Sequence, residues 1–105
     1  HTMGLIGTML NIVPIMGNDG NGGIELKTKV RGKKNAVDKL VEMIGLNNID
    51  FKNTILGITH VNALEKAYTI KEEIQKRYNF KDILVFKAGG LSTVYAGDGG
   101  IVIAY

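Results

Sequence analysis

Two stretches of the chain place apolar residues at the spacing of an α-helix. In residues 34–44 apolar side chains recur at i, i+1, i+4, i+5 and i+8, with charged residues opposite and Gly45 at the end, which predicts an amphipathic helix. Residues 63–78 carry a second stripe, and Asn62 with Glu65 three residues later is typical of a capped helix start. We expect both stripes to face one core; their members are Ala36, Val37, Leu40, Val41, Ile44, Leu64, Ala67, Ile70, Ile74 and Tyr78.

The other apolar stretches have the spacing or the length of β-strands. Residues 24–30 alternate apolar and polar side chains and follow the turn sequence GNDGNGG, which predicts a β-hairpin with residues 9–16 as its first strand. Pro14 lies inside that first strand, so we expect an edge strand or a helix end that runs into a strand. Residues 54–60 (TILGITH) form a short continuous apolar run of the kind buried inside a sheet. Two further strands are predicted at residues 82–88 and 100–105.

From the second strand of the hairpin onward the predicted order is strand, helix, strand, helix, strand, which predicts an α/β fold. We expect a mixed sheet of four to five strands with two helices and with the N-terminal hairpin at one side. The length of 105 residues suits a single domain at residues 4–105, and HTM at positions 1–3 is interpreted as a cloning remnant. Because the apolar residues 5–16 follow this start directly, we expect the domain to have been cut from a longer protein.

Composition narrows the class of protein further. The chain has no cysteine, which excludes disulfides and thiolate metal sites, and we expect it to work in the cytoplasm. No apolar stretch approaches the roughly 18 residues of a membrane span. The formal charge is +3, and most of the excess lies in the run KTKVRGKK, residues 27–34. A nucleic-acid module is the weakest interpretation of this run, because no pattern of exposed aromatic residues for base stacking accompanies it.

Two features at predicted strand ends are candidates for ligand binding. His60 ends the buried strand, and the loop GGLSTVYAGDGG, residues 89–100, follows the strand at residues 82–88. If these two strands are parallel, both features lie at the same edge of the sheet, where α/β proteins bind ligands. The loop is either a wide turn or a surface whose amides and hydroxyls face an anion. His60 is either a surface histidine near a helix start or a ligand contact, and no acid or cysteine at a readable spacing supports a metal site.

Arg31 differs from the other basic residues of the run. It stands with Gly32 where the predicted strand changes into the first helix, and a guanidinium held at such a junction suits a carboxylate or a phosphate. The alternative is that the whole run is the solvated face of the hairpin. A Walker-type nucleotide site is excluded, because the glycine loop lacks the Gly-Lys-Ser/Thr ending and precedes a strand rather than a helix.

The succession LNIVPI, KVRGKKNAVDKLVEMI, ITHVNALEKA and AGGLSTVYAGDGGIVIAY resembles the C-terminal portion of DegV-family proteins over nearly the whole chain. The resemblance implies one lobe of a bacterial two-lobed α/β protein that binds a fatty acid between its lobes and presents the carboxylate to a fatty acid kinase. It also implies roles for Arg31, which matches the arginine of the VRG motif, and for Tyr95, which stands where many members have histidine. Asp98 replaces a proline of the family's loop, and tyrosine donates a hydrogen bond but carries no positive charge.

On this basis we expect a lipid-binding domain without catalytic residues, cofactor or metal, which lacks the N-terminal lobe whose serine and threonine hold the carboxylate. A partner kinase would carry out the phosphoryl transfer. The expected ligand is a long-chain fatty acid, and the expected ligand-binding residues are Arg31, His60, Ser92, Thr93 and Tyr95. An uncovered cleft face would also let the domain self-associate. The alternative is a small-metabolite or phosphate-binding lobe of a kinase-like or regulatory α/β protein, which would use the same rim.

Overall fold

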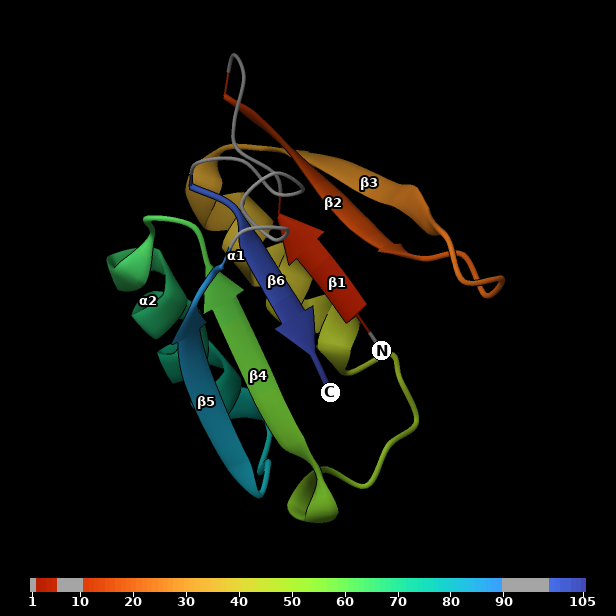
Figure 1. Cartoon of the computed structure of the whole chain (residues 1–105), viewed down its shortest axis with the longest axis vertical. Helices are drawn as coiled ribbons and strands as arrows, with labels where there is room; N and C mark the ends of the chain where they lie inside the picture. The colour runs from red at the N-terminus through yellow and green to blue at the C-terminus, as the bar shows by residue number, and fades with distance from the viewer. Residues whose placement is uncertain (1, 6–10, 90–98) are drawn as a thin grey trace.

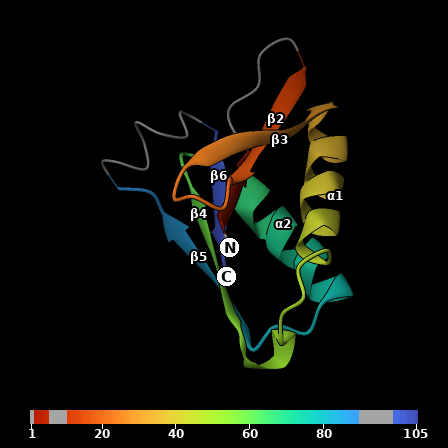
Figure 2. The same ribbon diagram turned by 90° about the vertical axis from the view of Figure 1, so that its right-hand side faces the viewer.

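The computed structural model describes residues 2–5, 11–89 and 99–105, which form a two-layer α/β fold (Figure 1). One layer is a six-stranded sheet with the order β3-β2-β1-β6-β4-β5. Both α-helices of the described residues pack on one face of this sheet and leave the other face open (Figure 2). Neither helix in this part of the chain is long and apolar enough to cross a membrane. The elements are β1 (Thr2–Leu5), β2 (Ile12–Asn18), β3 (Ile24–Arg31), α1 (Lys33–Ile44), η1 (Phe51–Asn53), β4 (Ile55–His60), α2 (Leu64–Arg77), β5 (Asp82–Lys87) and β6 (Ile101–Ala104).

The strand directions bring several strand ends to one edge of the sheet. β4 and β5 run parallel, with His60 opposite Lys87 at their ends, so the condition for both strand ends to share one edge is met. β6 is antiparallel to both β4 and β1, β1 is antiparallel to β2, and β2 is antiparallel to β3. The carboxyl ends of β1, β3, β4 and β5 therefore lie at the same edge, where α1 and α2 also begin (Figure 1).

The sheet has six strands rather than the predicted four to five. The additional strand is β1, which has only four residues, too few to show a period, and includes two positions interpreted as a cloning remnant. Because β1 pairs with Ile15, Met16 and Gly17 of β2, β2 is an inner strand, and the predicted edge strand is wrong. Pro14 stands opposite Lys29 of β3, beyond the residues that pair with β1, so its missing N–H removes no bond to β1.

The core lies between the sheet and the two helices. All five predicted residues of the α1 stripe are buried, and Leu40 is 0% exposed. In α2 the stripe is confirmed for Ala67, Ile70 and Ile74, but Leu64 is 53% exposed and its predicted place in the core is wrong. Leu64 is the first residue of α2, at the edge of the sheet, where the strands that cover the rest of the stripe have ended.

An aromatic cluster surrounds Phe51 of η1 and packs against the core. The ring of Phe51 lies 5.1 Å from those of Tyr78 and Phe80, and the ring of Phe80 lies 6.0 Å from that of Tyr105. The Tyr78 hydroxyl donates a hydrogen bond to the carbonyl oxygen of Val41 at 2.8 Å. Tyr78, predicted as part of the second stripe, therefore joins the end of α2 to α1.

The predicted capping box at the start of the second helix is wrong. α2 begins at Leu64 with Ala63 at the N-cap position, and no side chain makes a capping hydrogen bond. Asn62 has a φ of 52°, so the chain turns sharply at this residue before it enters the helix. The backbone amide of Ala63 instead donates its hydrogen bond to the ring of His60, the last residue of β4, inside a buried turn.

Candidate functional site

Two of the candidates that the sequence predicted stand at the edge where β3, β4 and β5 end. Arg31 ends β3 and His60 ends β4. The amide of Ala88 donates a hydrogen bond to the His60 carbonyl oxygen at 2.8 Å, and the amide of Gly99 donates one to the carbonyl oxygen of Val61 at 2.7 Å. Both flanks of the glycine loop are thus held beside the end of β4. Three predicted ligand residues lie outside the described residues, and their roles stay predictions: Ser92, Thr93 and Tyr95.

Arg31 lies at the turn from β3 into α1. Gly32 adopts a φ of 88°, which favours glycine, and its amide donates a hydrogen bond to the carbonyl oxygen of Asn11 at 2.8 Å. The side-chain amide of Asn35 donates a hydrogen bond to the Arg31 carbonyl oxygen at 3.0 Å. Arg31 stands opposite Ile12, which precedes a core residue of β2, so the alternation places both on the open face. The backbone at this junction is fixed while the Arg31 side chain is exposed.

His60 lies on the other face of the sheet. It follows the core residues Leu56 and Ile58 at every second position of β4, so the three share one face, and it is only 6% exposed. Its Nδ1 accepts a hydrogen bond from the backbone amide of Ala63 at 3.1 Å. Because a ring nitrogen that accepts a hydrogen bond carries no proton, the neutral imidazole carries its proton on Nε2. The interpretation of His60 as a surface histidine is wrong, since the side chain is buried and completes the turn before α2.

The fold separates Arg31 from His60. The two residues lie on opposite faces of the sheet, and β2, β1 and β6 lie between their strands. One small ligand therefore does not contact both side chains in this arrangement. His60 instead lines a hollow of about 580 Å³ between β5 and the start of α2, together with Asn62, Leu64, Tyr68, Val85 and Lys87.

The open face of the sheet carries large apolar side chains that no other described element covers. Six of them are between 38% and 50% exposed: Ile12, Ile24, Leu26, Ile55, Leu84 and Phe86. Gly57 lies beside Phe86 on this face, since a Cβ atom at Gly57 would lie 3.5 Å from the Phe86 ring. An exposed apolar face of this kind is typical of a surface that binds a partner or a ligand.

A β-bulge decides which hairpin residues reach the open face. Ile15 pairs with Thr28 and Met16 pairs with Leu26, so Lys27 is the extra residue of β3. Ile15 and Met16 are adjacent and therefore point to opposite faces of the sheet. Their partners Thr28 and Leu26 then point to opposite faces as well. Simple alternation along the sequence would place both on one side. The apolar surface on β3 was therefore not predictable from the spacing of its residues.

Positive charge borders the open face along β3. Lys29 and Arg31 are exposed and stand opposite Pro14 and Ile12 of β2, which places both basic residues on the open face. Lys27 belongs to the helix side, where its Cε would lie 2.9 Å from a Cβ atom at Gly17. The fold thus divides the basic run, and only part of it borders the apolar surface.

Comparisons with known proteins agree on one family. The model of the DegV family ("Uncharacterised protein, DegV family") matches residues 1–105. The chain is 34% identical to the DegV domain-containing protein YteA of Lactococcus lactis over 99 residues, which are 94% of this chain and 34% of that protein. It spans about a third of the length of the curated relatives it matches.

Two solved structures share the fold closely. A DegV family protein from Ruminococcus gnavus, determined with vaccenic acid, has a TM-score of 0.90 and 30% identity, over 97% of this chain and 43% of that one. A DegV family protein from Eubacterium eligens, loaded with heptadecanoic acid, has a TM-score of 0.85 and 26% identity over the same shares. The mixed sheet with two helices therefore matches one part of these larger structures.

Proposed function

The chain belongs to the DegV family, and from this premise we propose that it is the C-terminal portion of a fatty-acid-binding protein. The relatives from Ruminococcus gnavus and Eubacterium eligens were solved with vaccenic acid and heptadecanoic acid. Because the chain covers 43% of each, the remainder of such a protein would supply the rest of the site. That remainder would include the serine and threonine that the family resemblance assigns to the carboxylate. This chain would supply one wall and part of the rim.

The open face of the sheet carries this proposal. Its six exposed apolar side chains offer a surface on which an acyl chain is buried with a gain of about 0.8 kcal/mol per methylene. The face is apolar along the sheet and positive at the β3 border, where Lys29 and Arg31 lie. A fatty acid has the matching distribution, since a long apolar chain ends in one negative charge.

The chain contributes binding groups and no catalytic group in this proposal. Arg31 lies at the border where an anionic head group or a partner kinase would approach, and the kinase would form the acyl phosphate. The hydroxyls of Ser92, Thr93 and Tyr95 in the glycine loop would lie near the head group. His60 acts indirectly, because its carbonyl oxygen and ring hold the flank of that loop and the start of α2.

Native mass spectrometry with added vaccenic and heptadecanoic acid tests the proposal, on the chain itself and on a two-lobed protein that contains it. We expect saturable lipid binding that Phe86→Asp weakens by about tenfold or more, because a charge without a partner would be placed against the acyl chain. Leu46→Asp is the matched control. Leu46 is 77% exposed and follows α1, away from the open face, so this variant should bind lipid normally.

An equal loss of lipid in Phe86→Asp and Leu46→Asp would argue against the open face as the acyl wall. The absence of bound fatty acid from both the chain and the two-lobed protein would contradict the proposed function itself.

A further inference from the structure

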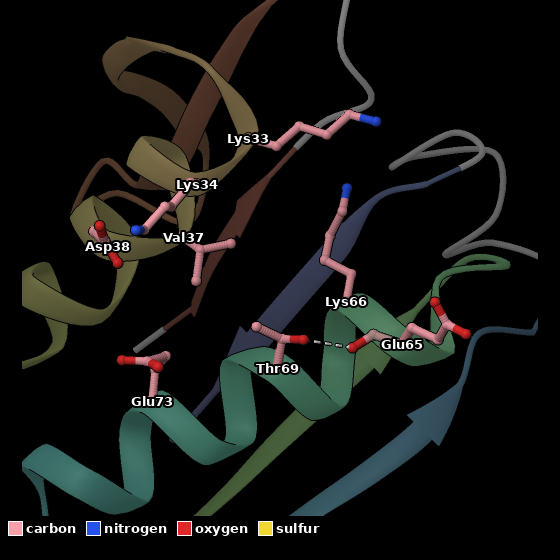
Figure 3. Close-up of a pocket in the computed structure, with 8 residues that line it drawn as sticks. All are labelled: Lys33, Lys34, Val37, Asp38, Glu65, Lys66, Thr69 and Glu73. Carbon is pink, nitrogen blue, oxygen red and sulfur yellow. Dashed lines mark hydrogen bonds between the residues drawn. The ribbon is translucent and has the colours of Figure 1, made fainter.

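A groove of about 470 Å³ lies between α1 and α2, in the helix layer and therefore away from the open face (Figure 3). Its volume is within the range of about 300 to 1,000 Å³ that small-molecule sites occupy. The proposed acyl wall uses none of the groove's residues. α1 contributes Lys33, Lys34, Val37 and Asp38, and α2 contributes Glu65, Lys66, Thr69 and Glu73.

Lys33 and Lys66 converge at the end of the groove where both helices begin. Their ammonium groups extend toward one another from α1 and α2 (Figure 3). Nζ of Lys66 donates a hydrogen bond to the carbonyl oxygen of Gly99 at 2.8 Å, which holds the ammonium in place. Partial burial lowers the pKa of Lys66, and the charge of Lys33 lowers it further. The two cations repel each other, and an anion between them would offset this repulsion.

No carboxylate of the described residues neutralises this pair. The ion pairs in this part of the chain involve neither Lys33 nor Lys66. Glu65 precedes Lys66 in the sequence, but its carboxylate points away from the Lys66 ammonium (Figure 3). Asp38 and Glu73 lie farther along the groove, away from the two ammonium groups (Figure 3). The groove therefore has a basic end at Lys33 and Lys66, and its other end holds Asp38 and Glu73 together with Lys34 (Figure 3).

We propose that Lys33 and Lys66 bind an oxyanion, the phosphate or carboxylate group of a small metabolite that occupies this groove. Each ammonium has three N–H donors, and Lys66 uses one of them on Gly99, so donors remain for the anion. An oxyanion between the two cations would replace their repulsion by charge-assisted hydrogen bonds. Asp38 and Glu73 would repel a long polyanion, so the site suits a compact ligand and not a nucleic acid. This site is independent of the proposed fatty-acid surface.

Nuclear magnetic resonance of the isotope-labelled chain tests the site, with inorganic phosphate and acetate as probes at constant ionic strength and chloride as the reference. We expect saturable shifts at Lys33 and Lys66, larger affinity for phosphate if a phosphate is the natural group, and larger affinity for acetate if a carboxylate is. Lys33→Gln and Lys66→Gln should each weaken binding about tenfold, as for the loss of one hydrogen bond to a charged group. Lys52→Gln, in η1, should change nothing.

Shifts that grow linearly, shifts that chloride reproduces, or an affinity that Lys33→Gln leaves unchanged would overturn the proposal. Lys33→Gln also decides the matter if Lys66→Gln disturbs the fold, because the described structure gives the Lys33 side chain no hydrogen bond to lose. Asp98 precedes Gly99 and lies outside the described residues, so Asp98→Asn is measured as well. Phosphate binding that appears only in Asp98→Asn would mean that the chain supplies its own anion, and the proposal would be wrong.

Discussion

The backbone amide of Ala63 donates a hydrogen bond to Nδ1 of His60 at 3.1 Å, inside the buried turn between β4 and α2. The carbonyl oxygen of the same His60 accepts a hydrogen bond from the amide of Ala88 at 2.8 Å. One residue therefore ties the end of β4 to the start of α2 and to the segment that leads into the glycine loop.

Replacing His60 should lower the free energy of unfolding, and its effect on ligand binding should be smaller. His60→Ala should lower the free energy of unfolding by about 1 to 3 kcal/mol, because the Ala63 amide loses its acceptor in a buried turn. His60→Asn places a side-chain oxygen near the position of Nδ1 and should recover part of this loss. Urea unfolding followed by circular dichroism measures both variants. A change below about half a kcal/mol in His60→Ala would contradict the structural role.

Leu40 tests the packing of α1 on the sheet. Leu40→Ala should lower the free energy of unfolding by about 2 to 5 kcal/mol, because the side chain is 0% exposed and its removal leaves a cavity. Leu46→Ala is the control, since Leu46 is largely exposed and its truncation should change stability by less than about half a kcal/mol. Equal effects of the two substitutions in a denaturant titration would show that the α1 stripe does not face the core.

The uncovered apolar face should make the chain self-associate and bind hydrophobic dyes. Phe86→Asp should reduce the dye fluorescence and shift the sedimentation velocity toward the monomer, since it places a charge on the apolar surface. Leu46→Asp should leave both readings unchanged. A chain that stays monomeric at high concentration and ignores the dye would count against an exposed apolar face.

Arg31 should matter more for acyl phosphate formation than for fatty acid binding. In a two-lobed protein that contains this chain, Arg31→Ala should leave most of the lipid affinity, because burial of the acyl chain at about 0.8 kcal/mol per methylene dominates it. Turnover by the partner kinase should fall. Lipid binding by mass spectrometry and acyl phosphate production are measured on the same preparation, with Lys52→Ala as the control. If Arg31→Ala abolishes lipid binding and turnover per bound lipid is unchanged, Arg31 holds the carboxylate itself.

Tyr105 should ionise at higher pH than an ordinary tyrosine. Burial raises the pKa of its hydroxyl above 10.0, while the hydrogen bond that Asn47 donates to the hydroxyl oxygen lowers it in part. Since the folded pKa lies above the unfolded one, the contribution to stability is complete below about pH 10 and is lost as the pH rises through the folded pKa. An ultraviolet titration should show a late phenolate transition that Tyr105→Phe removes and that Asn47→Leu moves to still higher pH. A transition at or below pH 10 would contradict the burial of this ring.

The sequence alone determined the elements whose residues must bury an apolar stripe or run. The α1 stripe around Leu40 and the α2 stripe around Ile70 were readable, because a helix that packs on a sheet needs apolar residues at the helical period. The buried β4 run and the position of His60 at a strand end followed from the same local signals, whereas the parallel pairing of β4 with β5 was left open. The family resemblance also came from motifs that are contiguous in the chain.

Only the tertiary structure decided which side chains share a surface. The extra residue Lys27 in β3 turns Leu26 to the open face. This bulge arises from the pairing of β3 with β2, so the alternation of apolar and polar residues in the sequence does not predict it. Four-residue β1 gains its place by pairing with β2, the next strand, and with β6 at the other end of the chain. Arg31 lies on the open face, whereas Lys33 and Lys66 meet in the helix layer, because the turn at Gly32 carries the chain from one layer to the other. Local periods predict what each element buries, but the contacts between elements are set by pairing and packing of residues that are distant in sequence.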